Sequence, residues 1–576
     1  LLCVTPPDEH QEQGIRAFLQ KKYGEDVALT IQQDSSLKSG FQLHVGSEVY
    51  DWSAKGRMEQ FRQQVEQLVA KNTRKDIIPL LRSSIDEFRL LAKSSEVGTV
   101  KSIGDGIAVV EGLEHAAYGE ILMFDNGIKG MVQDLRRNET GCILFDNADD
   151  ISAGSKVART GKTAGVPVGD AFLGRVVDAL GRPIDGGDAI PADGYRPVEE
   201  PAPGIIDRQS VDTPMETGLL SIDAMFPIGR GQRELIIGDR QTGKTAIALD
   251  AMLNQKGKNV ICVYVAIGQK ASSVAQLVEN LRKRDAMDYC VVVSATAGEA
   301  DTMQYIAPYA GCAMAEYYMH KGRDVLIVYD DLSKHAIAYR AMSLLLERAP
   351  GREAYPGDVF YLHSRLLERS AHLSDKLGGG SMTALPIVET QAGDVSAYIP
   401  TNIISITDGQ IFLESDLFFA GQRPAVNVGL SVSRVGGAAQ TKATKKATGS
   451  LRLDLAQYRE MEVFTQFSSD LDDSTKEQLH YGQGLMRILR QKQYHPLSMH
   501  QQVIVLVCAM GHVLSKVAVK DVTDFRDALL DHFEQEHSDL CRSLEDEKVL
   551  TDDMKQEILR IAEAFRTANA ERFRKE

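Results

Sequence analysis

A glycine-rich segment of this chain has the residue types and spacing needed to hold phosphate groups. Residues 238–245 read Gly-Asp-Arg-Gln-Thr-Gly-Lys-Thr and fit the pattern G-x-x-x-x-G-K-S/T. In such a loop the backbone N–H groups wrap an anion, Lys244 reaches the β- and γ-phosphates, and the Thr245 hydroxyl ligates Mg²⁺. The residues predicted to contact bound ATP or ADP are Gly238, Asp239, Arg240, Gln241, Thr242, Gly243, Lys244 and Thr245.

The elements expected on either side of this loop favour the same interpretation. Residues 234–237 read as a short buried strand, and Ala246 begins an apolar helical run. Because a phosphate loop joins a strand to a helix, this context favours a phosphate site over an ordinary glycine-rich turn.

A second strand is predicted to end beside the loop. Residues 325–329 are apolar and are followed by Asp330 and Asp331. Open α/β sheets bind ligands at the carboxyl ends of their strands, so we expect Asp330 to help hold Mg²⁺ through a bound water. Asp331 is expected only to cap the next turn.

The strand after the loop's helix ends in an amide rather than a carboxylate. Residues 261–268 are followed by Gln269. An amide cannot act as a general base, and a positioned base contributes about 10²–10⁴-fold to a rate. The sequence therefore predicts a site that binds nucleotide and hydrolyses it very slowly, although a glutamine orients the attacking water in some GTPases.

Length and charge limit the remaining possibilities. The chain has 576 residues, so about three or four domains are expected. The net charge of −15 argues against nucleic acid as a partner, and no run of about 18 apolar residues predicts a membrane span. The seven cysteines contain no C-x-x-C pair, which favours a reduced setting without zinc. The sequence begins at Leu1 without a methionine, which leaves open a longer natural N-terminus.

Changes in the pattern of apolar, glycine and helix-forming residues along the chain predict a multidomain α/β protein. The segments are a small α+β unit (1–72), a linker helix (73–95), a β-barrel (96–163), a phosphate-loop parallel α/β domain (164–440) and a C-terminal α-helical bundle (441–576). In the first unit we expect a helix over 9–23, a strand over 27–32, a hairpin over 41–51 turning at Gly46–Ser47, and a helix over 57–70. A further helix is expected over 77–92.

Apolar periodicity places the elements of the two large segments. Strands are expected at 234–237, 260–266, 290–294, 325–329 and 403–407. Helices are expected at 451–461, 501–513, 521–537 and 552–569. The basic stretch 442–446 is expected to be a solvated connector.

These motifs together resemble the alpha subunits of F-type ATP synthases over nearly all of residues 76–576. The resemblance is carried by residues 218–223, 227–245, 265–270, 329–334, 350–369, 398–402, 406–411 and 431–437. Catalytic beta-type subunits of that family carry glutamate where Gln269 stands. The resemblance implies a RecA-like nucleotide domain and a non-catalytic subunit that supports ATP synthesis driven by a proton or sodium gradient.

The resemblance also implies partners and site residues. It implies a hexamer of alternating alpha and beta subunits around the gamma stalk, peripheral on the cytoplasmic face of a bacterial membrane. Arg434 would enter the neighbouring catalytic site, where an arginine finger contributes about 10³–10⁵ in rate, and Ser396 and Ser431 would lie near that interface. The residues implied to cradle adenine and ribose are Arg423, Pro424, Gln491 and Gln493.

Residues 5–68 resemble the C-terminal domain of the delta subunit of the same synthase. The matching features include Lys22-Tyr-Gly, residues 34–40 and residues 49–59, with Trp52 where that family has glycine. We therefore predict a delta–alpha fusion whose first segment anchors the b-type peripheral stalk at a high effective concentration. The alternative is an idle fused segment.

Two other functions remain open from the sequence. A self-sufficient hexameric motor, such as a secretion ATPase or an RNA translocase, would carry glutamate at Gln269 and would hydrolyse ATP without a partner. A structural scaffold would hold one permanent nucleotide, and loss of nucleotide through a Lys244 substitution would then leave assembly intact.

Overall fold

The computed structural model describes residues 1–7, 9–23, 28–34, 37, 39–45, 48–54, 94–125, 127–146, 151–465 and 473–573. Two compact units make up the chain, Leu1–Ala164 and Gly165–Glu576. The helices predicted over 57–70 and 77–92 and the turn at Gly46–Ser47 lie outside the described residues. Among the residues described, no helix has both the length and the apolar character needed to cross a membrane.

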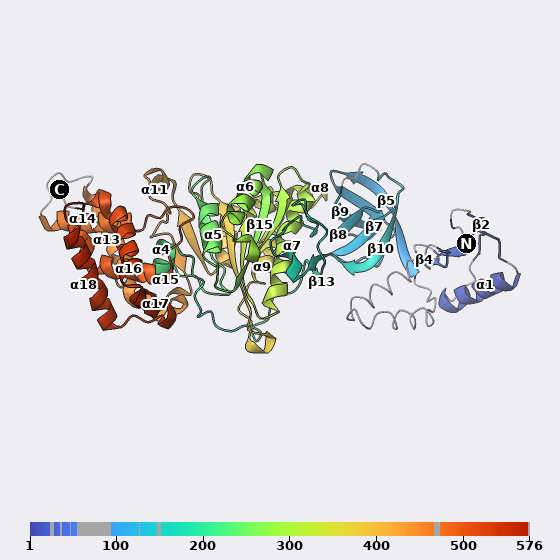
Figure 1. Cartoon of the computed structure of the whole chain (residues 1–576). Coiled ribbons are helices and arrows are strands. Elements are labelled where there is room, and N and C mark those ends of the chain that lie inside the picture. Colours follow the sequence, from blue (N-terminus) through green and yellow to red (C-terminus); the bar gives the residue numbers. More distant parts are fainter. Residues whose placement is uncertain are drawn as a thin grey trace, which may run out of the picture. The chain divides into compact units, whose positions relative to one another are not determined.

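The first unit begins with a helix and a small sheet (Figure 1). Helix α1 (Glu9–Tyr23) and the hairpin of β3 (Phe41–Val45) and β4 (Glu48–Asp51) match the prediction. Strand β1 (Leu2–Cys3) pairs with β3 and with β2 (Gln32–Gln33). Of the strand predicted over 27–32, Val27 lies outside the described residues and Gln32 lies in β2, but the prediction is wrong for residues 28–31, which belong to no regular element. Its apolar alternation buries little, since Ile31 remains 37% exposed, and β1 offers only two residues to pair with.

Trp52 packs in the aromatic core of this first sheet. Its ring lies 5.9 Å from that of Tyr50 and 5.0 Å from that of Phe41, measured between centroids. Phe18 of α1 meets Tyr50 edge to face at 5.4 Å. The tryptophan that replaces the expected glycine is therefore accommodated as a partly buried residue packed against this core.

A closed six-stranded barrel follows in the same unit. The strand order β10-β7-β8-β9-β6-β5 is closed by antiparallel pairing between β10 and β5. Leu122 and Val132 are among its fully buried core residues. The predicted barrel is confirmed; its strands are β5 (Ser94–Gly104), β6 (Ile107–Glu111), β7 (Glu120–Phe124), β8 (Lys129–Leu135), β9 (Glu139–Leu144) and β10 (Lys156–Thr163).

The second unit is built on an eight-stranded sheet with the order β12-β16-β15-β17-β18-β14-β19-β20. All neighbours are parallel except β19 and β20. The strands are β12 (Val176–Val177), β14 (Leu235–Gly238), β15 (Val260–Gln269), β16 (Cys290–Thr296), β17 (Asp324–Asp330), β18 (Ser381–Glu389), β19 (Gly409–Leu413) and β20 (Val432–Ser433), with a separate pair β11 (Gly165–Val168) and β13 (Gly194–Pro197).

Helices accompany this sheet (Figure 1). They are α4 (Leu220–Met225), α5 (Lys244–Leu253), α6 (Ala271–Arg282), α7 (Asp301–Met319), α8 (Leu332–Leu345), α9 (Val359–Leu367), α10 (Tyr398–Ile406) and α11 (Ser415–Phe419). Strands β15 and β17 read as continuous apolar runs because a parallel sheet covered on both faces buries alternate side chains equally. Four of the five strands predicted here are confirmed to within a few residues.

The fifth predicted strand, over 403–407, is wrong. Its β-branched residues form the end of helix α10, in which Ile399, Ile403 and Ile406 recur at helical spacing and are buried. Burial of that face outweighs the β preference of isoleucine. The strands of the sheet that were not predicted are β12, β18, β19 and β20. Strand β18 was not predicted because it contains Pro386, and proline is rare in central strands. Pro386 nevertheless lies in the centre of the sheet, opposite Tyr329.

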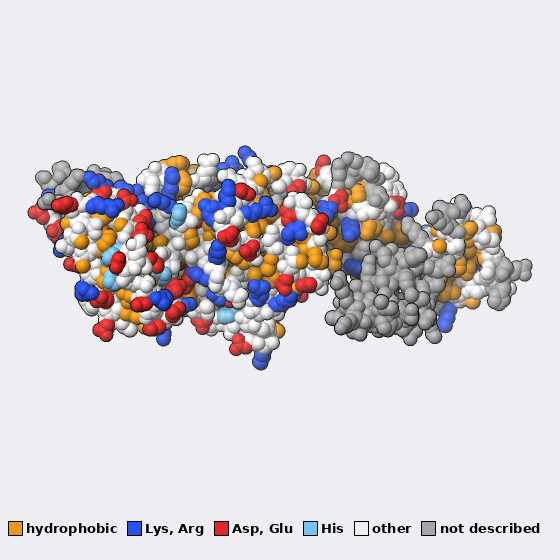
Figure 2. Space-filling model, in the orientation of Figure 1, with side chains coloured by type: hydrophobic (Ala, Val, Ile, Leu, Met, Phe, Trp, Pro, Cys, Tyr) orange, Lys and Arg blue, Asp and Glu red, His pale blue; other side chains and the backbone are white. Residues whose placement is uncertain are grey.

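The C-terminal part of this unit is helical, as predicted. Its helices are α12 (Lys442–Thr448), α13 (Leu451–Thr465), α14 (Asp473–Ile488), α15 (Met499–Met510), α16 (Val522–Glu536), α17 (Ser538–Glu547) and α18 (Asp552–Ala568). The basic stretch predicted as a connector is instead helix α12, which buries Ala443 and Ala447 and exposes its lysines. Acidic and basic side chains are interspersed on the visible face of these helices (Figure 2).

Candidate nucleotide site

The phosphate loop has a backbone that two of its glycines make possible. Gly243 has a φ of 93°, in the left-handed region, and lies directly before α5. A side chain at Gly238 would bring its Cβ within 2.5 Å of the Leu413 carbonyl oxygen on neighbouring β19. The loop therefore follows β14 closely and leads into the N-terminus of α5, where free N–H groups attract anions.

Lys244 is directed into the loop rather than toward solvent. Its Nζ donates to the carbonyl oxygens of Gly238 at 3.0 Å and Asp239 at 2.5 Å, and the side chain is largely buried. Burial lowers the pKa of Lys244, while nearby carboxylates, that of Glu389 first among them, oppose the shift. Its ammonium thus lies inside the loop where phosphate oxygens are expected.

Asp239 ties the loop to two other segments. Its carboxylate accepts hydrogen bonds from the Thr390 hydroxyl at 2.6 Å, the Gly393 N–H at 2.8 Å and the Ser415 hydroxyl at 3.1 Å. Burial raises the pKa of Asp239, but these hydrogen bonds outweigh burial and leave the pKa lowered. Asp239 therefore fixes the loop. Beside it, Arg240 is exposed and pairs with Glu389, and Gln241 is exposed with a φ of 62°.

The Thr245 hydroxyl faces the end of β17. It donates to Asp330 Oδ2 over 2.7 Å, and the buried Tyr264 hydroxyl donates to the same oxygen over 2.5 Å. Burial raises the pKa of Asp330, and these two hydrogen bonds partly oppose the shift. The two predicted magnesium residues thus lie together. The carboxylate of neighbouring Asp331 accepts from the Lys334 N–H at the start of α8, which confirms the predicted cap.

Gln269 completes this group at the end of β15. Its Nε2 donates to Asp330 Oδ1 over 3.1 Å. The end of β15 beside Asp330 therefore holds an amide rather than a carboxylate, and this amide donates to the Asp330 carboxylate.

The residues expected around adenine lie in different environments, because Arg423 and Gln493 are exposed and Gln491 is buried. Arg423 is exposed and lies over the Phe418 ring at 4.3 Å, and Phe418 in turn approaches Gly243 of the loop. Pro424 follows Arg423. Gln491 is buried, with its amide hydrogen-bonded to the backbone of Gly218 and Leu220, so it holds chain segments together. The side chain of Gln493 is exposed.

Arg434 lies away from this chain's own phosphate loop. It follows β20, and its N–H donates to the Asp408 carbonyl just before β19, whereas Gly238 pairs with Leu413 at the other end of β19. At about 3.3 Å per residue the two positions are roughly 16 Å apart along the strand. Its side chain is exposed.

The two serines grouped with Arg434 occupy different environments. Ser431 is fully buried, and its hydroxyl accepts the Phe412 N–H at 3.0 Å. Ser396 is exposed on the segment after β18, where its hydroxyl donates to Asp394.

Sequence reasoning missed three residues of the site. Tyr264, which holds Asp330, is hidden in an apolar strand. Glu389 ends β18 and Thr390 follows it, and the proline that obscured this strand removed the signal for both. A polar residue at the end of an apolar run could have indicated Glu389 and Thr390, whereas no such signal marks Tyr264 inside β15.

Comparisons with known proteins place most of the chain in one family. Models of the ATP synthase alpha/beta family match the nucleotide-binding domain at residues 218–433, the C-terminal domain at 440–565 and the β-barrel domain at 93–161. A model of the ATP synthase delta (OSCP) subunit matches residues 2–65.

The chain also matches two curated proteins over almost their whole length. "ATP synthase subunit alpha" of Clostridium botulinum (strain Hall) is 58% identical over 483 residues, 84% of this chain and 96% of the relative. The protein with that name from Clostridium kluyveri (strain NBRC 12016) is 56% identical over 491 residues, 85% of this chain and 97% of the relative. The chain belongs to the nucleotide-binding alpha subunits of the F-type ATP synthase family, preceded by a segment of the delta (OSCP) family.

Proposed function

We propose that this chain holds Mg-nucleotide without turning it over and lends Arg434 to the catalytic site of an adjacent beta subunit. The observation that carries the first half is the amide of Gln269, 3.1 Å from Asp330 Oδ1. An amide takes no proton from water, so the general-base contribution of about 10²–10⁴-fold is missing from this pocket. The nucleotide therefore remains bound and acts on assembly and regulation.

The oxygen atoms of the pocket fit magnesium. The Thr245 hydroxyl and the Asp330 carboxylate are hard ligands, 2.7 Å apart, next to the phosphate loop. Magnesium bound there would neutralise phosphate charge. Thr245 would ligate the ion directly and Asp330 would hold one of its waters. Lys244 would exchange its bonds to the Gly238 and Asp239 carbonyls for phosphate oxygens.

The adenine end of the nucleotide would lie toward Arg423, Pro424 and Gln493. The Arg423 guanidinium over Phe418 supports a stacking role there, since Phe418 also approaches the loop at Gly243. Gln491 would act indirectly, because its amide fixes the Gly218 and Leu220 backbone and its N–H donates to the Arg423 carbonyl.

The position of Arg434 supports action in a neighbouring subunit. Its backbone N–H is bonded to Asp408, whose carboxylate accepts Arg233 at 2.9 and 3.0 Å, while the Arg434 side chain is exposed. A trans-acting arginine requires a fixed backbone and an exposed guanidinium, and Arg434 has both, although its charge also acts on the buried carboxyl of Glu234. The phosphate loop of its own chain is out of reach. Ser431 would hold the segment of Arg434 in place through its hydrogen bond to the Phe412 N–H. Ser396 would lie near the same subunit interface, on the segment after β18.

An arginine that acts in a neighbouring catalytic subunit implies an assembly of both kinds of subunit. The chain would alternate with beta subunits around a gamma stalk, on the cytoplasmic face of the membrane. Its delta-like segment would contact the b-type peripheral stalk. Retention of b-type subunits by the full chain, and its loss on deletion of residues 1–72, would support the anchoring role; equal retention by both would reject it.

The central test compares ATP turnover by the purified chain with turnover after reconstitution with a beta-type subunit. We expect near-zero turnover alone and strong stimulation on mixing. Arg434→Ala should lower the stimulated rate by about 10³–10⁵ and leave nucleotide bound to this chain. Arg542→Ala, which removes another exposed arginine in the helical region, is the matched control and should keep full stimulation.

Two outcomes would overturn the proposal. Rapid hydrolysis by the isolated chain would identify a self-sufficient motor. Full stimulation with Arg434→Ala would show that this cation does not reach the beta site. If a Lys244 variant lost nucleotide yet assembled and worked normally, the bound nucleotide would be dispensable.

A further inference from the structure

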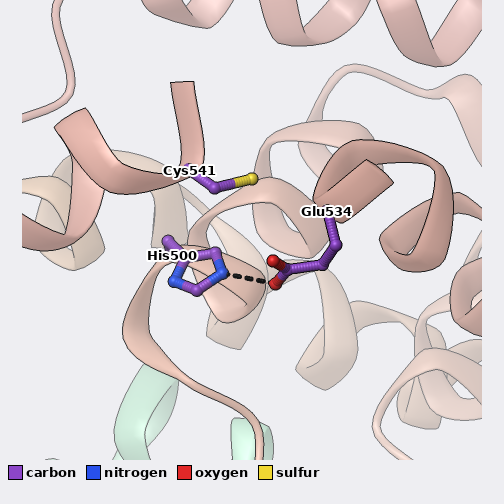
Figure 3. A group of neighbouring side chains, drawn as sticks. All are labelled: His500, Glu534 and Cys541. Atoms are coloured by element: carbon purple, nitrogen blue, oxygen red, sulfur yellow. Dashed lines mark hydrogen bonds and ion pairs between the residues drawn. The ribbon is translucent and has the colours of Figure 1, made fainter. Parts of the chain in front are cut away.

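Three helices of the C-terminal region bring together a histidine, a glutamate and a cysteine. His500 lies in the first turn of α15, Glu534 lies near the end of α16, and Cys541 lies in α17. Figure 3 shows their side chains pointing toward one another. One nitrogen, oxygen or sulfur atom from each lies within 4.8 Å of the others. This group is separate from the nucleotide site and has no part in the proposed function.

We propose that His500, Glu534 and Cys541 form a binding site for a zinc-class divalent cation. Imidazole, carboxylate and thiolate are the three ligand types that zinc takes in proteins, and a thiolate with an imidazole selects against magnesium and calcium. Three protein ligands leave a fourth position for water.

The spacing suits an ion after small side-chain movements. Zinc lies about 2.0–2.3 Å from such ligands, so a tetrahedral site separates them by roughly 3.3–3.7 Å. Here His500 Nε2 and Glu534 Oε1 are 2.7 Å apart, and the widest separation in the group is at most 4.8 Å. Shifts of about 1 Å at the side-chain ends therefore bring all three atoms to coordination distance.

The groups around the ligands provide the support that metal sites use. The other ring nitrogen of His500, Nδ1, lies 2.8 Å from Glu545 Oε2, which matches the carboxylate–histidine–metal arrangement. The ligating oxygen of Glu534 also accepts the Gln501 amide at 3.2 Å. Such partners orient ligands and increase their basicity. If His500 only formed ion pairs with Glu534 and Glu545, the nearby Cys541 thiol would have no role in the group.

Coordination has a definite proton balance. Burial raises the pKa of the Cys541 thiol to about 11, and its Sγ–H faces the Phe533 carbonyl at 3.7 Å. The ion replaces that proton and any proton on His500 Nε2, and both are released to solvent. The product links α15, α16 and α17 through one ion.

The test titrates the purified full chain with Co²⁺ in the presence of excess Mg-ADP, which occupies the phosphate-loop site. We expect one equivalent of bound cobalt with a thiolate-to-cobalt charge-transfer band, and displacement of that cobalt by Zn²⁺. His500→Gln should abolish tight binding. Cys541→Ser should remove the thiolate band.

Second variants separate a metal site from general damage to the fold. Glu545→Gln should weaken binding about 10–100-fold and keep the thiolate band, because it supports a ligand without being one. Cys508→Ser changes another buried cysteine, on α15, and should leave stoichiometry and spectrum unchanged. Absence of a thiolate band in the unmodified chain would overturn the proposal, as would equal loss from the Cys508 and Cys541 variants. If Cys541→Ser fails to fold, the unmodified spectrum and the Glu545 variant still decide the question.

Discussion

The Thr245 hydroxyl donates a 2.7 Å hydrogen bond to Asp330 Oδ2, and this bond joins the first turn of α5 to the end of β17. The two residues are 85 positions apart in the chain. This contact places a hydroxyl and a carboxylate oxygen side by side at the carboxyl end of a strand in the parallel sheet.

Thr245→Ala should reduce the magnesium-dependent part of nucleotide affinity. A hydrogen bond to a charged group contributes roughly 1.5–3 kcal/mol, so we expect the Kd for ADP with Mg²⁺ to rise about tenfold or more. Titration calorimetry with Mg²⁺ and with EDTA measures this difference. Thr245→Ser keeps the hydroxyl and should bind normally; an equal loss with and without Mg²⁺ would contradict the assignment.

Gln269→Glu should give the pocket a base. We expect single-turnover hydrolysis by the isolated chain to rise on the order of 10²-fold, at the low end for a positioned general base, because Asp330 opposes a second carboxylate. Gln269→Ala is the control and should give no increase. Equal rates for the glutamate and alanine variants would mean that a missing base is not what limits turnover.

Arg369→Ala should destabilise the second unit strongly. The buried Arg369 guanidinium makes two 2.7 Å bonds to Glu316 and one of 2.6 Å to the Val198 carbonyl. Removing Arg369 leaves the buried Glu316 carboxylate with Arg196 alone, at 3.3 Å, so we expect a loss of about 3 kcal/mol in the free energy of unfolding, measured with urea. The double change Arg369→Met with Glu316→Leu should recover most of it.

The exposed pair of Arg560 and Glu557 supplies the matched control for that experiment. Arg560→Ala should leave the urea midpoint unchanged, because solvent screens an exposed pair. A similar loss from both arginine variants would argue against a special contribution from burial.

Acid should destabilise the first unit through Glu48. Hydrogen bonds from Tyr23 and then Tyr50 lower the pKa of Glu48 from 4.5 to about 2. A pKa that is lower in the folded state stabilises the fold fully above about pH 4.5, and this contribution is lost as the pH falls toward about 2. Trp52, the single tryptophan of the chain, stacks on Tyr50 and reports the change by fluorescence.

Glu48→Gln is the control for this acid transition. The variant lacks the titrating carboxylate, so its Trp52 signal should vary less between pH 4.5 and pH 2 than that of the unmodified chain. Superimposable acid titrations of the two proteins would exclude a contribution from Glu48.

The sequence alone determined the features that depend on neighbouring residues. The phosphate loop is specified by the spacing of Gly238, Gly243 and Lys244, because backbone wrapping and helix entry are local requirements. Asp330 and Gln269 could be placed beside it, because the carboxyl ends of parallel strands meet at one edge. Apolar runs as continuous as those of β15 and β17 allow few other structures.

Only the tertiary structure decided the features that depend on distant partners. The isoleucines near Ile403 form a helix because their buried face lies at helical spacing, and Gln491 binds the backbone of Gly218 rather than pointing outward. The meeting of His500, Glu534 and Cys541 also leaves no trace in their spacing along the chain. In each case the deciding free energy is burial or hydrogen bonding between segments far apart in sequence, which local propensity does not contain.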